Sequence, residues 1–127
     1  MMINLLKDNK LVEKTEQLDK DYNIEYYKVL STGNREELEY FQICIFNKEH
    51  MLISIKVLDA KTQDYKDYIT RNGLDKCIRT DDYNIGYSYD GDEEIYKACC
   101  EDDLHFYILK CNIKDEKEFT DLIGSIF

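Results

Sequence analysis

Large apolar side chains recur at every second position along two neighbouring segments of the chain, residues 41–45 and residues 51–57. An alternation with a period of two is typical of β-strands that bury one face. The residues between the segments, Asn47-Lys48-Glu49-His50, are polar and suit a turn. This part of the sequence therefore predicts a β-hairpin.

Three other segments place their apolar residues at helical intervals, which is typical of amphipathic helices. The apolar stripes consist of Leu5, Val12 and Leu18; of Tyr65, Tyr68 and Ile69; and of Phe119, Leu122, Ile123 and Ile126. We therefore expect helices over residues 2–20, 61–71 and 115–127. Asn72-Gly73 is a typical helix end and predicts where the second helix stops.

The remaining chain contains five further segments with the composition of short strands. They are residues 22–30, 76–80, 83–89, 93–101 and 104–111. The first is expected to close with a turn at Ser31-Thr32-Gly33-Asn34, which is rich in turn formers.

Two turns set the expected pairing of the last strands. Asp90-Gly91 readily supplies the positive φ angles of a two-residue type I′ turn, and Asp102-Asp103 is the candidate for the next loop. The first turn places Tyr87 opposite Glu94, Ile85 opposite Tyr96 and Tyr83 opposite Ala98. The second places Cys100 opposite His105, Ala98 opposite Tyr107 and Tyr96 opposite Leu109.

With this pairing, both faces of the sheet are apolar, so both need cover from helices. One face carries Tyr83, Ile85, Tyr87, Tyr96, Ala98, Tyr107 and Leu109, and the other carries Ile95, Cys99, Leu104, Phe106 and Ile108. The expected order is αβββαββββα. It describes a single α+β domain over residues 1–127, an antiparallel sheet of about six to seven strands with helices packed on it.

Composition narrows the class of protein. The 127 residues include 27 Asp and Glu against 17 Lys and Arg, a formal net charge of −10, with 43% hydrophobic residues. That apolar content is too high for an acidic disordered tail, and no apolar run is long enough to cross a bilayer. The negative charge disfavours direct contact with nucleic acid, which needs a local excess of Lys and Arg. We expect no membrane and no nucleic-acid partner.

The N-terminus and the cysteines predict a cytoplasmic location. The apolar residues at the start of the sequence are followed at residues 7–10 by charged and polar residues, so they form a shorter apolar stretch than a secretory signal needs. No lipobox-like cysteine follows. The five cysteines are an odd number without a short-range pairing pattern. Free thiols in a reducing compartment explain this usage.

Residues 50–127 also resemble the PsbP-like superfold, a group that includes small bacterial lipoprotein and secretion-chaperone domains. The matching segments are the strands at 52–57 and 83–89, the helix around 65–69, the hairpin through Tyr107 and the closing helix at 118–127. Members of this group mostly bind other proteins and share no active site. The resemblance therefore implies an α+β fold and a protein-binding role.

Acidic residues concentrate between residues 81 and 103, where nine carboxylates accompany a single base, Lys97. The predicted hairpin gathers Asp81, Asp82, Glu101, Asp102 and Asp103 at one end, and Asp90, Asp92, Glu93 and Glu94 at the other. Like charges held together repel unless a partner or an ion compensates them. These residues are our candidates for binding a partner with a basic surface, and the alternative is ordinary polar turns in an acidic protein.

Other chemistry has little support in the sequence. A calcium loop over 90–101 would need glycine at its sixth position, where Ile95 stands. Cys100 and His105 form the one thiol–imidazole pair that the predicted register brings together, without a third group to orient the base. No phosphate loop, nucleophile elbow or zinc-protease motif occurs. We expect no catalytic residue, metal or cofactor.

Our leading hypothesis is a small non-enzymatic protein-binding module, an adaptor, a chaperone or an immunity-type inhibitor, that uses an acidic, Tyr-rich surface. The tyrosines concerned are Tyr26, Tyr27, Tyr40, Tyr65 and Tyr68, whose spacing favours core positions over interface anchors. One alternative is a nucleic-acid mimic that inhibits a DNA- or RNA-binding protein. Another is a thiol-dependent enzyme around Cys100 and His105. A homodimer formed through an exposed edge strand is a further alternative.

Overall fold

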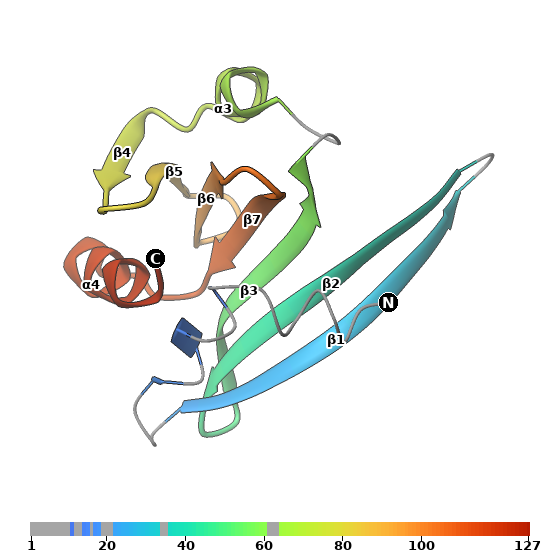
Figure 1. Cartoon of the computed structure of the whole chain (residues 1–127). Helices are drawn as coiled ribbons and strands as arrows, with labels where there is room; N and C mark the ends of the chain where they lie inside the picture. The colour runs from blue at the N-terminus through green and yellow to red at the C-terminus, as the bar shows by residue number, and fades with distance from the viewer. Residues whose placement is uncertain (1–10, 12–13, 16, 19–21, 34–35, 61–63) are drawn as a thin grey trace.

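The structure is a computed structural model that describes residues 11, 14–15, 17–18, 22–33, 36–60 and 64–127 (Figure 1). Its elements are β1 (Tyr22–Gly33), β2 (Glu36–Asn47), β3 (His50–Asp59), α3 (Tyr65–Asn72), β4 (Lys76–Arg79), β5 (Asn84–Asp90), β6 (Ile95–Glu101), β7 (His105–Cys111) and α4 (Glu116–Ile126). The strands form one antiparallel sheet in the order β1-β2-β3-β7-β6-β5-β4. This architecture confirms the predicted α+β class and the order βββαββββα over the part of the chain that is described.

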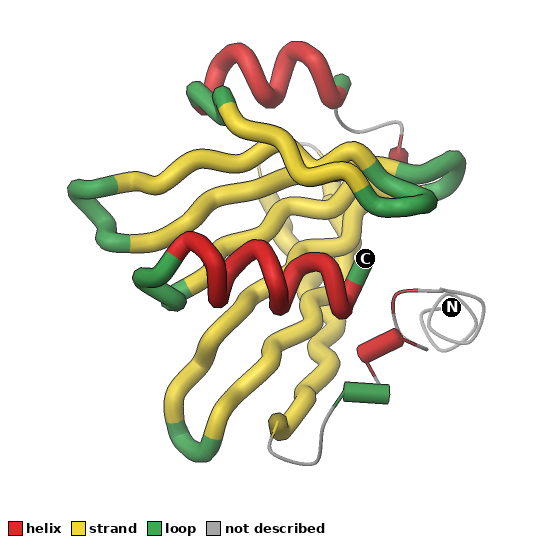
Figure 2. The backbone as a smooth tube through the Cα atoms, turned by 90° about the vertical axis from the view of Figure 1, so that its left-hand side faces the viewer, coloured by secondary structure: helices red, strands yellow, loops and turns green. Residues whose placement is uncertain are grey.

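The sheet runs between the two helices, and each helix covers one of its faces (Figures 1 and 2). The larger core contains the buried side of α4, with Phe119, Leu122, Ile123 and Ile126, packed on Ile and Tyr side chains of the strands. The smaller core lies under α3 and consists of Leu58, Leu74, Cys99 and Phe106, with Tyr65, Tyr68, Ile69 and Ile108 packed against it. The prediction that helices cover both faces is therefore correct.

Side-chain and backbone caps fix both ends of α3. The Asp64 carboxylate accepts a hydrogen bond from the Asp67 N–H at the N-terminus, and Gly73 adopts the left-handed conformation at the C-terminus with φ 65°. These caps satisfy backbone groups that have no partner inside the helix. The predicted stop at Asn72-Gly73 is confirmed, whereas residues 61–63 of the predicted helix lie outside the described residues.

A glycine in the middle of β5 allows α3 to approach the sheet. A Cβ atom at Gly86 would lie 2.7 Å from Ile69 Cδ1, which is closer than real carbon atoms come. The missing side chain thus explains a residue that is otherwise unfavourable inside a strand.

The register of the last strands differs from the predicted one. Tyr87 pairs with Ala98 instead of Glu94, because four residues, Gly91 to Glu94, form the turn between β5 and β6. The positive φ of 56° falls on Glu94, so Asp90-Gly91 does not form the expected type I′ turn. Both register errors, here and between β6 and β7, are even numbers of residues. Side chains therefore keep the predicted face, since successive residues alternate across a strand.

The N-terminal third also differs from expectation. β1 continues through residues 31–33, where a turn was predicted, because these residues pair with residues 36–38 of β2. Beyond the end of the β2–β3 pairing, β1 and β2 continue as a two-stranded ribbon (Figure 1). Of the predicted helix over 2–20, residues 11, 14 and 15 are helical, and most of the rest lies outside the described residues. Leu11 joins the larger core.

Candidate functional site

The nine carboxylates of residues 81–103 lie at the two ends of the β5–β6 hairpin. Asp81 and Asp82 precede β5, and Glu101, Asp102 and Asp103 lie where β6 ends, so antiparallel pairing places them at one end of the sheet. We call this the acidic end. Asp90, Asp92, Glu93 and Glu94 lie at the opposite end of the same hairpin.

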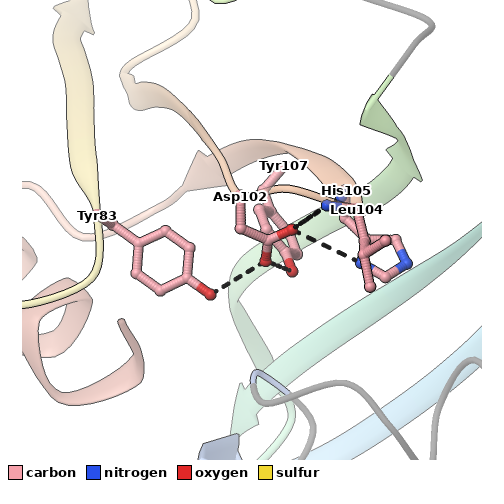
Figure 3. Close-up of polar contacts among 5 residues, drawn as sticks. All are labelled: Tyr83, Asp102, Leu104, His105 and Tyr107. Atoms are coloured by element: carbon pink, nitrogen blue, oxygen red, sulfur yellow. Dashed lines mark hydrogen bonds and ion pairs between the residues drawn. The ribbon is translucent and has the colours of Figure 1, made fainter.

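Asp102 is the centre of a hydrogen-bonded cluster at the acidic end (Figure 3). Its Oδ1 accepts hydrogen bonds from the backbone N–H groups of Leu104 (3.0 Å) and His105 (2.8 Å). Its Oδ2 accepts from the hydroxyls of Tyr107 (2.7 Å) and Tyr83 (3.3 Å). The carboxylate thus joins the turn at residues 102–104, which we call the Asp102 turn, to β7 and to the residue before β5.

The Asp102 cluster keeps its negative charge. Burial raises the pKa of the Asp102 carboxyl, but the hydrogen bonds from the Tyr107 hydroxyl and the His105 and Leu104 amides outweigh it, and the net pKa is lowered. Burial also raises the pKa of Tyr83 to about 12, with the charge of Asp102 adding to the effect. The Tyr83 hydroxyl therefore remains a protonated donor, and its hydrogen bond does not neutralise the carboxylate.

Leu104 projects from this turn into solvent. Its side chain is 70% exposed, the largest value among the big hydrophobic residues that the structure describes. Its backbone is held on both sides, because its N–H donates to Asp102 and its carbonyl accepts from the Ala60 N–H at 3.0 Å. The turn therefore presents an apolar side chain on a backbone that is held in place. The sequence assigned Leu104 to a covered face, and this prediction was wrong.

Four exposed carboxylates share the end of the sheet with Leu104. Asp81, Asp82, Glu101 and Asp103 are all exposed, and none of them forms an ion pair with another described residue. The turn that carries Asp81 and Asp82 is closed by a hydrogen bond from the Thr80 N–H to the Tyr83 carbonyl at 2.9 Å. Tyr83 then links this turn to Asp102.

Three of the four carboxylates at the opposite end, Asp90, Glu93 and Glu94, lie close to lysines instead. Asp90 lies 2.9 Å from Lys97 Nζ, and Glu93 lies 3.6 Å from the same nitrogen. The Lys97 ammonium and the backbone N–H groups of Glu93 and Asp92 lower the pKa of Asp90. Lys114 follows β7 in the chain, and its Nζ lies 3.8 Å from Glu94 Oε2. Within the described ranges, no three His, Cys, Asp or Glu side chains are grouped to hold a metal ion.

The predicted pairing of Cys100 with His105 is wrong. Cys100 lies opposite Tyr107, and His105 lies opposite Asp59 of β3, because four residues, 102–105, and not two separate the last paired residues of β6 and β7. The Cys100 side chain is fully buried, and burial raises the pKa of its thiol well above the usual value. Both facts oppose the thiolate that a nucleophilic cysteine needs.

Most tyrosines lie in or against the cores. Tyr26, Tyr65 and Tyr68 are half-buried, as their spacing favoured, and Tyr27 is exposed. The side chain of Tyr40 lies outside the described residues. Among the described side chains, the exposed surface is therefore rich in acidic residues and contains few tyrosines.

Sequence reasoning missed two contributors to the acidic end, Leu104 and Asp59. Asp59 is exposed at the end of β3 and pairs with His105 across the sheet. Its position follows from the pairing of β3 with β7, which no local pattern in the sequence indicates. The position of Leu104, directly after Asp102-Asp103, could have indicated that Leu104 belongs to the turn and not to the strand.

No family model, no curated protein and no solved structure matches the chain. The resemblance to the PsbP-like superfold therefore stays a prediction. Within the described part of the chain, neither helix has the length and apolar character to span a membrane.

Proposed function

We propose that this protein is a small non-enzymatic protein-binding module, an adaptor, a chaperone or an immunity-type inhibitor, that docks on a basic partner through its acidic end. The observation that carries the proposal is the exposed Leu104 on a turn that Asp102 holds in place. An apolar anchor that is already ordered costs little entropy when it enters a partner's pocket. The partner should offer an apolar pocket for Leu104.

The charges around Leu104 define the rest of the partner's surface. Asp59, Asp81, Asp82, Glu101 and Asp103 are exposed at the same end of the sheet, and Asp102 adds a carboxylate that accepts from tyrosine hydroxyls and lies 3.9 Å from the His105 imidazole. Lysines or arginines around the partner's pocket would complement this charge. Such complementarity raises the rate of association and selects the partner.

The alternative of a nucleic-acid mimic has weaker support. A mimic needs carboxylates spread in a continuous array over one face, whereas these carboxylates fall in two groups separated by the length of the β5–β6 hairpin. Asp90 and Asp102 are also engaged within the protein. The geometry favours a localised docking site.

Affinity capture with matched baits tests the proposal. The tagged full chain, its Leu104→Ser variant and a Met51→Ser control would be incubated at low salt with extract of the source cell. Met51 is also exposed, at 39%, but it lies at the start of β3. The other end of β3, at Asp59, is the one that pairs with His105 beside the Asp102 turn.

We expect the wild-type and Met51→Ser baits to recover the same basic protein, and Leu104→Ser to recover at least about tenfold less, as for an interface anchor. The proposal fails if no protein is recovered at low salt. It also fails if all three baits recover the same proteins in equal amounts.

A further inference from the structure

A groove lined by described residues lies beside α4, and none of its lining residues belongs to the acidic end. Its volume is about 750 Å³, within the usual range of ligand-binding sites. Its walls come from segments that are distant in the sequence, including the β2–β3 turn region, the residues after β7 and α4. Leu52, Ile113 and Leu122 supply apolar surface to it, and all three also pack on the larger core.

Charge on the groove is predominantly negative. Glu118 and Asp121 lie one helical turn apart on α4 and both line the groove. Both are exposed, and neither forms an ion pair with another described residue. Lys14 is the one basic side chain among the described lining residues, and its ammonium donates to the Phe127 carbonyl at 2.7 Å.

The groove is open to solvent along its length. Of the described residues that line it, only Leu122 is buried, and the others are half-buried or exposed. A small-molecule site normally encloses most of its ligand. An open groove with an apolar floor and two carboxylates on one wall suits a short stretch of polypeptide.

We infer that this groove is a second docking surface, which binds a peptide segment with alternating apolar and basic side chains. The apolar side chains lie on Leu52, Ile113 and Leu122. A lysine or arginine of the segment pairs with Glu118 and Asp121. The surface is separate from the Asp102 turn, so the inference goes beyond the function proposed above.

Fluorescence anisotropy with labelled synthetic pentapeptides tests the inference on the full chain. The probe is Leu-Lys-Leu-Lys-Leu, with Leu-Glu-Leu-Glu-Leu and Ser-Lys-Ser-Lys-Ser as controls for charge and for apolar contact. We expect the first peptide to bind at least about tenfold more tightly than either control, since both kinds of contact contribute.

Two charge-matched variants locate the binding. Glu118→Gln with Asp121→Asn removes two carboxylates from the groove, and Asp92→Asn with Glu93→Gln removes two from an exposed turn elsewhere. We expect the first pair to weaken binding of Leu-Lys-Leu-Lys-Leu about tenfold and the second pair less than about twofold. Equal weakening by both pairs would indicate general attraction to an acidic protein and overturn the inference.

Amide chemical shifts on peptide addition give the footprint. The inference predicts the largest changes in α4 and around residues 47–52. Changes confined to residues 101–105 would overturn the groove while leaving the proposed acidic-end site intact. Equally tight binding of 2-phenylethylamine would overturn the assignment to a peptide.

Discussion

Two turns of this protein begin with the same local arrangement and end with opposite electrostatics. Asp90 and Asp102 each accept two backbone hydrogen bonds on Oδ1 from the residues that follow. The second oxygen of Asp90 meets the Lys97 ammonium, whereas that of Asp102 meets two tyrosine hydroxyls. A lysine neutralises the carboxylate and a tyrosine does not. One end of the hairpin thus has lysines beside three of its four carboxylates, and at the other end we propose that a partner meets the charge.

The partners of the two carboxylates also determine how much each contributes to stability. The side chains of Asp102 and Asp90 are similarly accessible, at 32% and 27% exposed, but the hydroxyl partners of Asp102 belong to buried tyrosines. Removing Asp102 would take a charged acceptor away from two buried hydroxyls. Asp90 binds the partly exposed Lys97 ammonium and the backbone N–H groups of the exposed residues Asp92 and Glu93, all of which water can reach.

The largest expected effect is therefore on folding stability. Asp102→Ala should lower the free energy of unfolding by about 2–3 kcal/mol, because four hydrogen bonds to a charged group are lost, two of them from buried tyrosine hydroxyls. Asp90→Ala should cost about 1 kcal/mol or less, as for the loss of an exposed cap. Urea denaturation of both variants measures the difference. Equal losses would remove the distinction between the two turns.

Acidification should reduce the contribution of Asp102. Its pKa in the folded protein is below the ordinary 3.8, so its stabilisation is fully present above the unfolded-state value and is lost as pH falls through the folded-state pKa. We expect the stability difference between wild type and Asp102→Ala to be constant above about pH 5 and to shrink below about pH 4. Urea denaturation across this range gives the measurement, and a pH-independent difference would contradict the charged state of Asp102.

The smallest effect on stability is expected for Lys97→Met, which removes the cation that compensates the Asp90 turn. The Lys97 pairs are partly exposed, so the change should be about 1 kcal/mol or less. Its electrostatic effect should be clear in amide spectra recorded with hexaamminecobalt(III). In the wild type, this cation should perturb residues 101–105 more than residues 91–94. In Lys97→Met, both turns should respond, and an unchanged pattern would show that Lys97 does not compensate the charge.

Much of the fold could be predicted from local patterns, because strand alternation and helical stripes reflect which side is buried. The predicted faces are correct although the registers are not, since the errors are even numbers of residues. The loop lengths were missed because Asp90 and Asp102 bind the backbone of their own turns, which lengthens both loops beyond two residues. Local sequence alone does not reveal whether an aspartate side chain binds the backbone of its own turn.

The candidate site was only partly predictable. The sequence located the carboxylates at the two ends of the hairpin, since this follows from strand direction. It could not separate Asp102, which is engaged by Tyr83 and Tyr107, from its exposed neighbours, because these tyrosines come from other parts of the sheet. The exposure of Leu104 depended on the same unpredicted turn.

The central claim is that the acidic end, and not the Asp90 turn, binds the partner. Isothermal titration calorimetry on the partner captured by the wild-type chain tests it with two variants that each remove two negative charges. We predict that Glu101→Gln with Asp103→Asn weakens binding about tenfold, whereas Asp92→Asn with Glu93→Gln changes it less than about twofold. Equal weakening by the two variants, or a larger loss from the second, would contradict the account.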